Sequence, residues 1–113
     1  MNEFYKLQTT VRGINNKSTT YPIYYINLNN IQSITTKEKE ETIDGHGKII
    51  KFYLVVNNVD YEYDSVYIIK GSDNEELVEY IRIRLKGLVH DIINSAKGNS
   101  VISKILNTIK GYK

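Results

Sequence analysis

The spacing of apolar residues changes near Gly71–Ser72, and this change constrains the fold more than any other feature of the chain. Before it, apolar residues mostly alternate with polar ones, as at Val59, Tyr61 and Tyr63. After it, they recur every three or four positions, at Leu77, Ile81, Leu85, Leu88 and Ile92. Alternation is typical of a strand with one buried face, and the longer spacing is typical of an amphipathic helix. The sequence therefore predicts a sheet followed by a helix.

The segment before residue 71 consists of short alternating runs separated by residues that favour turns. The predicted strands are residues 3–12, 20–28, 31–36, 48–56 and 59–64, and residues 66–70 either extend the last strand or form another short one. Asn57-Asn58 predicts a tight hairpin, because Asn tolerates positive φ. Residues 44–47 contain two glycines and predict a second reversal, with the charged run 37–41 on an arm of that hairpin.

The long helix is expected over residues 72–97. Ser72 with Glu75, and equally Asp73 with Glu76, have the spacing of a capping box at its start. Gly98 follows the expected end, where glycine is common. Inside the helix, Gly87 costs about 1 kcal/mol relative to Ala. We interpret Gly87 as a site of close packing.

A second helix, short and basic, is expected at residues 99–110. Its apolar stripe consists of Val101, Ile102, Ile105, Leu106 and Ile109. Because about ten residues do not form a stable helix alone in water, this segment is expected to pack on the body of the protein, on another chain or on a membrane surface. Residues 97–113 carry four lysines and no acid, which indicates a solvated C-terminus or, as the alternative, an anionic partner.

The whole chain, residues 1–113, is expected to form one α+β domain. We expect a curved antiparallel β-meander or partly closed barrel of about five to six strands in residues 1–70, followed by a long C-terminal amphipathic helix and the short second helix. The N-terminus lacks the pattern of a signal peptide, and no apolar run is long enough to cross a membrane, which favours a cytoplasmic protein.

No pattern of catalytic or ligand-binding residues is visible. The chain has no cysteine, and its two histidines are His46, in a predicted turn, and His90, on the polar side of the helix. A zinc site needs three or four ligands at suitable spacing, and a phosphate-binding loop needs a longer glycine-rich motif. We therefore expect no enzymatic activity, no cofactor and no metal.

Two sets of residues are candidates for binding. The candidate protein interface comprises Ile83, which points away from the main helical stripe, and the short helix residues Ile102, Ile105, Leu106 and Ile109. The candidate contacts to nucleic acid or another anion are Tyr25, Lys51, Tyr53, Lys104 and Lys110. Single-strand binders combine exposed aromatic side chains with cations. The alternative for the sheet residues is a second core layer, a barrel interior or an oligomer interface.

Residues 21–96 run as meandering strands closed by one long helix, and this order resembles that of bacterial pleckstrin-homology-like domains. The segment Ile26–Ile34 resembles their strand–turn–strand, and Phe52–Val56, Tyr61, Tyr63 and the helix start at Glu75 are similar to the rest of the pattern. The resemblance implies a binding module for phosphoinositides or proteins. The loop that reads phosphoinositides is basic, whereas Lys37 and Lys39 here alternate with acids, which argues against lipid binding.

The leading hypothesis is a non-enzymatic binding or adaptor module that acts through protein contacts and associates with itself. The alternative is a single-stranded nucleic-acid-binding protein that uses a Tyr/Lys sheet face and the basic tail. The small size and the abundance of Ile, Asn, Lys and Tyr also suit a phage or mobile-element protein, whose place would be the host cytoplasm.

Overall fold

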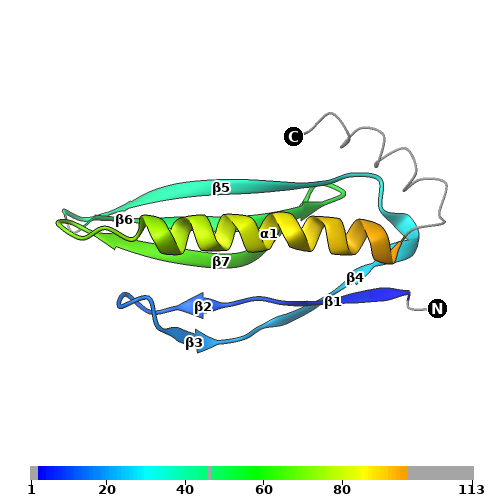
Figure 1. Cartoon of the computed structure of the whole chain (residues 1–113), viewed down its shortest axis with the longest axis horizontal. Helices are drawn as coiled ribbons and strands as arrows, with labels where there is room; N and C mark the ends of the chain where they lie inside the picture. Colours follow the sequence, from blue (N-terminus) through cyan, green and yellow to red (C-terminus); the bar gives the residue numbers. More distant parts are fainter. Residues whose placement is uncertain (1–2, 46, 97–113) are drawn as a thin grey trace.

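The computed structural model describes residues 3–45 and 47–96, and Figure 1 shows how their elements are arranged. Along the chain these are the strands β1 (Phe4–Gln8), β2 (Val11–Arg12), β3 (Ser18–Thr20) and β4 (Ile23–Asn27), the 3₁₀ turn η1 (Leu28–Asn30), the strands β5 (Ile34–Ile43), β6 (Gly47–Val56) and β7 (Val59–Ile69), and the helix α1 (Glu75–Ser95). The predicted α+β class, with antiparallel strands before a long helix, is confirmed. The predicted short helix at 99–110 lies outside the described residues.

Three long strands form an antiparallel sheet in the order β5-β6-β7. The predicted hairpin at Asn57-Asn58 joins β6 to β7, and both residues have positive φ, 52° and 65°. At the other end, Gly45 and Gly47 also have positive φ, 70° and 132°, where β5 turns into β6. The charged run 37–41 lies within β5, on an arm of this second hairpin as predicted.

β7 is one continuous strand with a β-bulge in its middle. Tyr61 lies opposite Leu54, but Asp64 lies opposite Phe52, so the register shifts by one residue between them. The side chains that face the core are therefore odd-numbered before the shift and even-numbered after it. This change of phase accounts for the apparent interruption near residue 65 in the sequence pattern.

The N-terminal part forms two short ladders, in which β1 pairs with β4 and β2 with β3. The predicted strand 3–12 is interrupted at residues 9–10, and the predicted strand 20–28 is interrupted near its start, at residues 21–22. The described residues consequently form seven strands instead of five or six. The backbone N–H of Thr9 donates to the carbonyl oxygen of Pro22 at 2.8 Å, which continues the β1–β4 register between the two ladders. Next to it, the N–H of Thr10 donates to Tyr63 on β7 at 2.9 Å.

The expectation of a partly closed barrel is wrong for the described residues. Their strands belong to three separate ladders, and no strand pair joins β5 to the N-terminal ladders. Figure 1 shows β3 at the side opposite β5, and β4 running across β1 toward the start of β5. The outer edges of β5 and β4 pair with no described strand.

α1 begins at Glu75 and not at residue 72, because the predicted capping boxes do not form. The Ser72 hydroxyl instead donates to the carbonyl oxygen of Ile69 at 2.8 Å. Asp73 Oδ1 accepts from the backbone N–H of Glu75 at 3.0 Å, and Asn74, at the N-cap, makes no side-chain capping bond. These bonds form a turn before the helix, so the side chains of Ser72 and Asp73 stabilise this turn and do not cap the helix.

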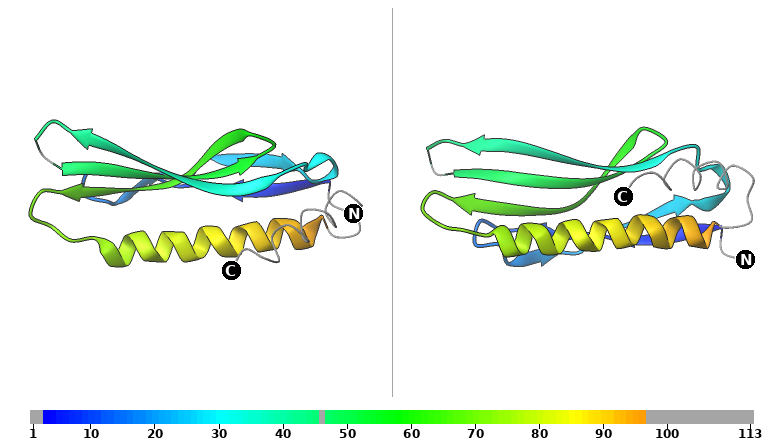
Figure 2. Two further views of the ribbon diagram at one scale, coloured as in Figure 1. Left: turned by 90° about the horizontal axis from the view of Figure 1, so that it is seen from above. Right: turned by 45° about the horizontal axis from the view of Figure 1, so that its top comes forward.

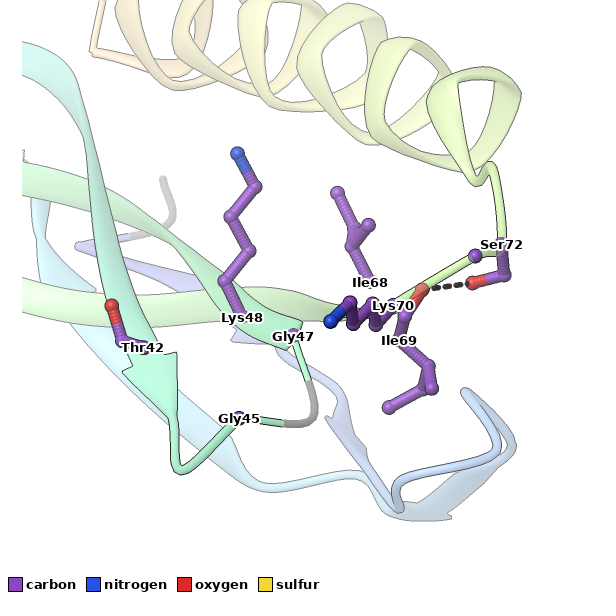
Figure 3. A pocket seen from close by; sticks show the side chains of 9 residues that line it. Thr42, Gly45, Gly47, Lys48, Ile68, Ile69, Lys70 and Ser72 are labelled. Atoms are coloured by element: carbon purple, nitrogen blue, oxygen red, sulfur yellow. Dashed lines mark hydrogen bonds between the residues drawn. The ribbon is translucent and has the colours of Figure 1, made fainter.

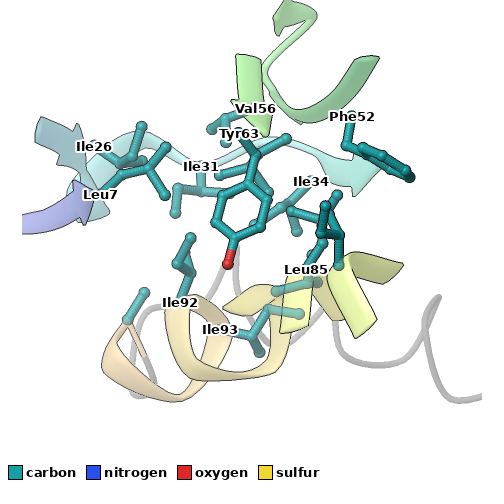
Figure 4. Packing of buried hydrophobic residues seen from close by; sticks show 14 of the residues in the cluster. Leu7, Ile26, Ile31, Ile34, Phe52, Val56, Tyr63, Leu85, Ile92 and Ile93 are labelled. Atoms are coloured by element: carbon teal, nitrogen blue, oxygen red, sulfur yellow. The ribbon is translucent and has the colours of Figure 1, made fainter. Parts of the chain in front are cut away.

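α1 runs along one face of the strand layer, as Figure 2 shows. Its buried residues are Val78, Ile81, Leu85, Val89, Ile92 and Ile93. On the sheet, Phe52 and Leu54 of β6 are fully buried. Figure 4 shows that Leu7 and Ile26 of the β1–β4 ladder join the same cluster as Ile92 and Ile93 of α1. One hydrophobic core therefore connects the N-terminal ladder, the long sheet and the helix.

Candidate binding surfaces

The face of the β5–β6–β7 sheet that points away from α1 is called the open face below. In an antiparallel ladder, residues directly opposite each other point to the same side. The open face therefore carries Thr35, Lys37, Lys39 and Glu41 from β5, Ile49, Lys51, Tyr53 and Val55 from β6, and Asp60, Glu62, Ser65 and Tyr67 from β7. No described helix or strand packs against this face in Figure 2. Lys51 and Tyr53 lie on it together, as the sequence predicts.

The charged groups of the open face neutralise one another. Lys51 Nζ lies 3.0 Å from Glu41 Oε2, and Lys37 pairs with Asp60 across the sheet. The hydrogen bond from Lys51 lowers the pKa of Glu41 below its ordinary value, and the same bond raises the pKa of Lys51. Lys37 Nζ also lies 5.2 Å from the centre of the Tyr53 ring. Lys51 and Tyr53 are thus already engaged by neighbours in the chain.

Tyr25 lies elsewhere, on the outer face of the β1–β4 ladder. The exposed side chains of Phe4, Ile23 and Tyr25 lie on this face, and Tyr21, two residues before Ile23, is also exposed. We call these four side chains the N-terminal apolar face. Tyr25 is 63% exposed and Phe4 52%. Lys6 lies directly opposite Tyr25 in the ladder. The structure therefore separates Tyr25 from Lys51 and Tyr53, and the sequence-based set does not form one site.

Phe4, Tyr21 and Ile23 were not among the sequence-based candidates, although the chain contains a signal for them. Residues 18–36 include no Asp, Glu, Lys or Arg. Such a segment is long for a surface strand, because natural proteins usually place charges on exposed edges. The alternation of Tyr21, Ile23 and Tyr25 then places all three on one side of the strand.

Ile83 is 64% exposed on the outer side of α1, which agrees with its predicted position. Tyr80 is also exposed there, and the Arg84 guanidinium lies 5.5 Å from the centre of its ring. A Cβ atom added at Gly87 would meet nothing within 4 Å, so the close packing predicted for Gly87 is wrong within the described structure. The other predicted contacts, Ile102, Lys104, Ile105, Leu106, Ile109 and Lys110, lie outside the described residues.

A buried polar cluster attaches the β2–β3 hairpin to β7. The Arg12 guanidinium donates to both carboxylate oxygens of Asp64, at 2.8 and 3.2 Å, and to the carbonyl oxygen of Asn16 at 2.7 Å. The Asn16 side-chain amide donates to the carbonyl oxygen of Tyr67 at 2.9 Å and accepts from its N–H at 2.7 Å. Each polar group of the cluster meets a partner within the chain, so the cluster holds the fold together.

A pocket of about 480 Å³ lies where the β5–β6 turn approaches the end of β7, as Figure 3 shows. Thr42, Lys48, Ile68, Lys70 and Ser72 contribute to its lining. The Ser72 hydroxyl is used as a donor to Ile69, and Lys48 Nζ pairs with Glu40 at 3.0 Å. One of the pocket's two hydroxyl groups and one of its two lysines therefore bind to the chain itself.

Within the described residues, no group of three or more His, Cys, Asp or Glu side chains is placed to hold a metal ion. His90 is exposed on α1, and His46 lies outside the described residues. A search of the helices in the described ranges found none that is both long and apolar enough to cross a membrane.

Comparisons with known proteins add no family. Neither a family model, nor a curated protein, nor a solved structure matches this chain significantly.

Proposed function

We propose that this chain is a non-enzymatic binding module that acts through protein contacts, with the N-terminal apolar face as its contact surface. The observation that carries the proposal is the exposure of Phe4, Ile23 and Tyr25 on one face of a two-stranded ladder, with Tyr21 also exposed two residues before Ile23. Contiguous exposed apolar surface is typical of interaction sites, and aromatic residues are enriched at protein interfaces. The resemblance to pleckstrin-homology-like domains stays a prediction, and it agrees with a binding role.

The open face is less suited to such a contact. Its three lysines, Lys37, Lys39 and Lys51, face three acids, so a partner would have to break ion pairs in order to desolvate it. The N-terminal apolar face presents no acid from β1 or β4, and Lys6 is its one strand cation. Burying this face removes apolar area from water at little electrostatic cost.

A photo-crosslinker on the proposed surface tests the function. Tyr25 is replaced by p-benzoylphenylalanine in the full chain, and the same probe at Glu76, an exposed position at the start of α1, is the matched control. After irradiation in cells that produce the protein, we expect a protein adduct of defined mass from position 25 and none from position 76. The absence of any adduct at position 25, or equal adducts at both positions, would contradict the proposal.

A second candidate function is binding of single-stranded nucleic acid at the same face. It is favoured by the pairing of Tyr25 with Lys6 and by the diagonal position of Phe4. Bases stack on exposed aromatic rings, and a nearby cation contacts phosphate. Lys6→Ala is then expected to reduce both the affinity for an oligonucleotide and its salt dependence, whereas Lys51→Ala leaves them nearly unchanged. Filter binding at low and at moderate salt measures the affinity of each variant for the oligonucleotide. A photo-crosslink from position 25 to nucleic acid would favour this function over protein binding.

A further inference from the structure

The outer edge of β4 has backbone groups that pair with no described residue. The bonds from Thr9 N–H to Pro22 and from Leu28 N–H to Glu3 show which β4 residues point their backbone groups toward β1. They are the even-numbered ones, because hydrogen-bonded and non-hydrogen-bonded pairs alternate along an antiparallel ladder. Within β4, the N–H and C=O groups of Ile23 and Tyr25 therefore point away from β1, toward the free edge. The C=O of Asn27 is used by the turn η1, for which Asn27 is the N-cap.

Pro22 does not protect this edge. Its carbonyl oxygen accepts from Thr9, so the position at which proline lacks an N–H faces β1. Proline on an edge strand blocks pairing only where the missing donor faces outward. The outward donors of Ile23 and Tyr25 are both retained.

The two open edges of the strand layer differ in charge. β5 carries five consecutive charged residues, 37–41, whereas residues 18–27 along β3 and β4 carry none. If two β5 edges paired antiparallel about a two-fold axis within the charged run, like charges would lie opposite each other. A pair centred at Lys39, for example, places Lys39 against itself and Glu38 against Glu40. Such charges are a common protection of natural edge strands, and the β4 edge lacks it.

We propose that two copies of this chain pair through the outer edges of β4, antiparallel about a two-fold axis at Tyr24, and so join their sheets. This register places Ile23 opposite the partner's Tyr25 and Tyr21 opposite the partner's Asn27. Ile23 and Tyr25 of each copy then exchange backbone hydrogen bonds with Tyr25 and Ile23 of the other copy. Pairs of aromatic and β-branched residues are favourable cross-strand neighbours, and no charge opposes another. The inference rests on the proposed function and names a second copy as the partner.

Amide exchange in the unmodified full chain tests the edge directly. At concentrations where the dimer forms, the N–H groups of Ile23 and Tyr25 are expected to exchange about tenfold or more slowly than in dilute protein. The outward amides of β5 provide the control and are expected to exchange equally fast at both concentrations. Fast exchange of Ile23 and Tyr25 in a proven dimer would overturn the inference, because β4 would then not be paired.

Matched lysine substitutions locate the interface. Tyr25 and Ile83 are almost equally exposed, 63% and 64%, so Tyr25→Lys and Ile83→Lys add the same charge at similar sites on β4 and α1. Because a two-fold axis repeats each substitution, Tyr25→Lys is expected to raise the dimer dissociation constant about 100-fold, and Ile83→Lys to leave it unchanged. Ile23→Pro removes an outward donor and is expected to give a folded monomer. Light scattering after size exclusion measures mass, and circular dichroism checks folding.

The outcomes separate this inference from the proposed function. If Ile83→Lys dissociates the dimer and Tyr25→Lys does not, the copies meet through α1, and the inference is overturned while self-association stands. If the wild-type chain is a monomer at every concentration, the inference is also overturned. The proposed function then depends on whether position 25 crosslinks to a different protein.

Discussion

At the scale of single residues, the most deeply buried ion pair of the described residues is that of Arg12 and Asp64. Their side chains are 14% and 7% exposed, and two parallel hydrogen bonds join them. Arg82 makes an equally bidentate contact to Glu38, at 2.7 and 2.8 Å, but these side chains are 46% and 39% exposed. The two arginines therefore allow the same bidentate Arg–carboxylate interaction to be compared at a buried site and at an exposed site.

Arg12→Ala is expected to lower the free energy of unfolding by about 3–5 kcal/mol, because it leaves the Asp64 carboxylate buried without its cation. Arg82→Ala removes a solvent-exposed pair and is expected to cost about 1 kcal/mol or less. Urea unfolding of both variants and the wild type measures the difference. Equal losses would show that Asp64 is solvated in the folded protein.

Tyr63 is expected to make stability depend on alkaline pH. Burial raises the pKa of Tyr63 above its ordinary value of 10.0. The unfolded chain therefore loses this proton at lower pH than the folded protein does, so the contribution is complete below pH 10 and is lost as pH rises through the folded-state pKa. Tyr63→Phe is expected to flatten the alkaline decline in the free energy of unfolding. Burial also raises the pKa of Tyr5, which accounts for a remaining decline.

The face of a strand on which a residue lies could be predicted from the sequence, but the residue's contacts on neighbouring strands could not. The alternation of residues 48–56 puts Lys51 and Tyr53 on one face and Phe52 and Leu54 on the other, and the structure shows that the face with Phe52 and Leu54 is the buried one. The partners Glu41, Asp60 and Lys37 come from neighbouring strands, so they follow only once the register is known. The same limit applies to Arg12 and Asp64, which are far apart in the sequence.

At the scale of elements, hairpins with clear turn residues were predictable and interruptions were not. Asn57-Asn58 fixed the β6–β7 hairpin because positive φ is tolerated at both positions. The break of the first strand after Gln8 has no comparable local signal, because Thr9 and Thr10 are good strand residues. Their hydrogen bonds diverge to Pro22 and Tyr63, two partners that lie far along the chain.

The β5–β6 hairpin depends on a close approach at Gly47. Its φ is 132°, and an added Cβ would clash with the Ile68 carbonyl oxygen and lie 2.9 Å from Ile69 Cα. Gly45 also has positive φ, but a Cβ there would meet nothing within 4 Å. Gly47→Ala is therefore expected to destabilise the protein by about 1–3 kcal/mol more than Gly45→Ala, as thermal unfolding would show. An equal effect would mean that only the backbone conformation matters.

At the scale of the whole molecule, the order of a sheet followed by a helix was predictable, because the change in apolar spacing is local. Closure of the sheet into a barrel was not predictable, because it depends on whether the first and last strands of the layer pair with each other. β5 pairs only with β6 and β4 only with β1, so the charged β5 edge and the uncharged β4 edge are not joined. Some apolar side chains of the strands point away from α1, and the sequence does not show what covers them. In the structure they lie on the N-terminal apolar face and on the open face.

Self-association is expected to make thermal stability depend on concentration. Binding of a second folded copy stabilises the folded state by mass action, so Tm rises as the protein is concentrated. For Tyr25→Lys, Tm is expected to be nearly independent of concentration. Differential scanning calorimetry over a hundredfold range, about 2 μM to 200 μM, measures both. A constant wild-type Tm across that range would contradict dimer formation.

The core shared by Leu7, Ile26, Ile92 and Ile93 also determines when the protein folds during its synthesis. A ribosome makes β1 and β4 first and the end of α1 much later. An isolated two-stranded ladder is only marginally stable in water, so the first strands wait for residues 92 and 93 to leave the exit tunnel. During this delay the uncharged segment 18–36 is exposed on the nascent chain. We therefore expect the N-terminal half to be a chaperone substrate until α1 has left the exit tunnel.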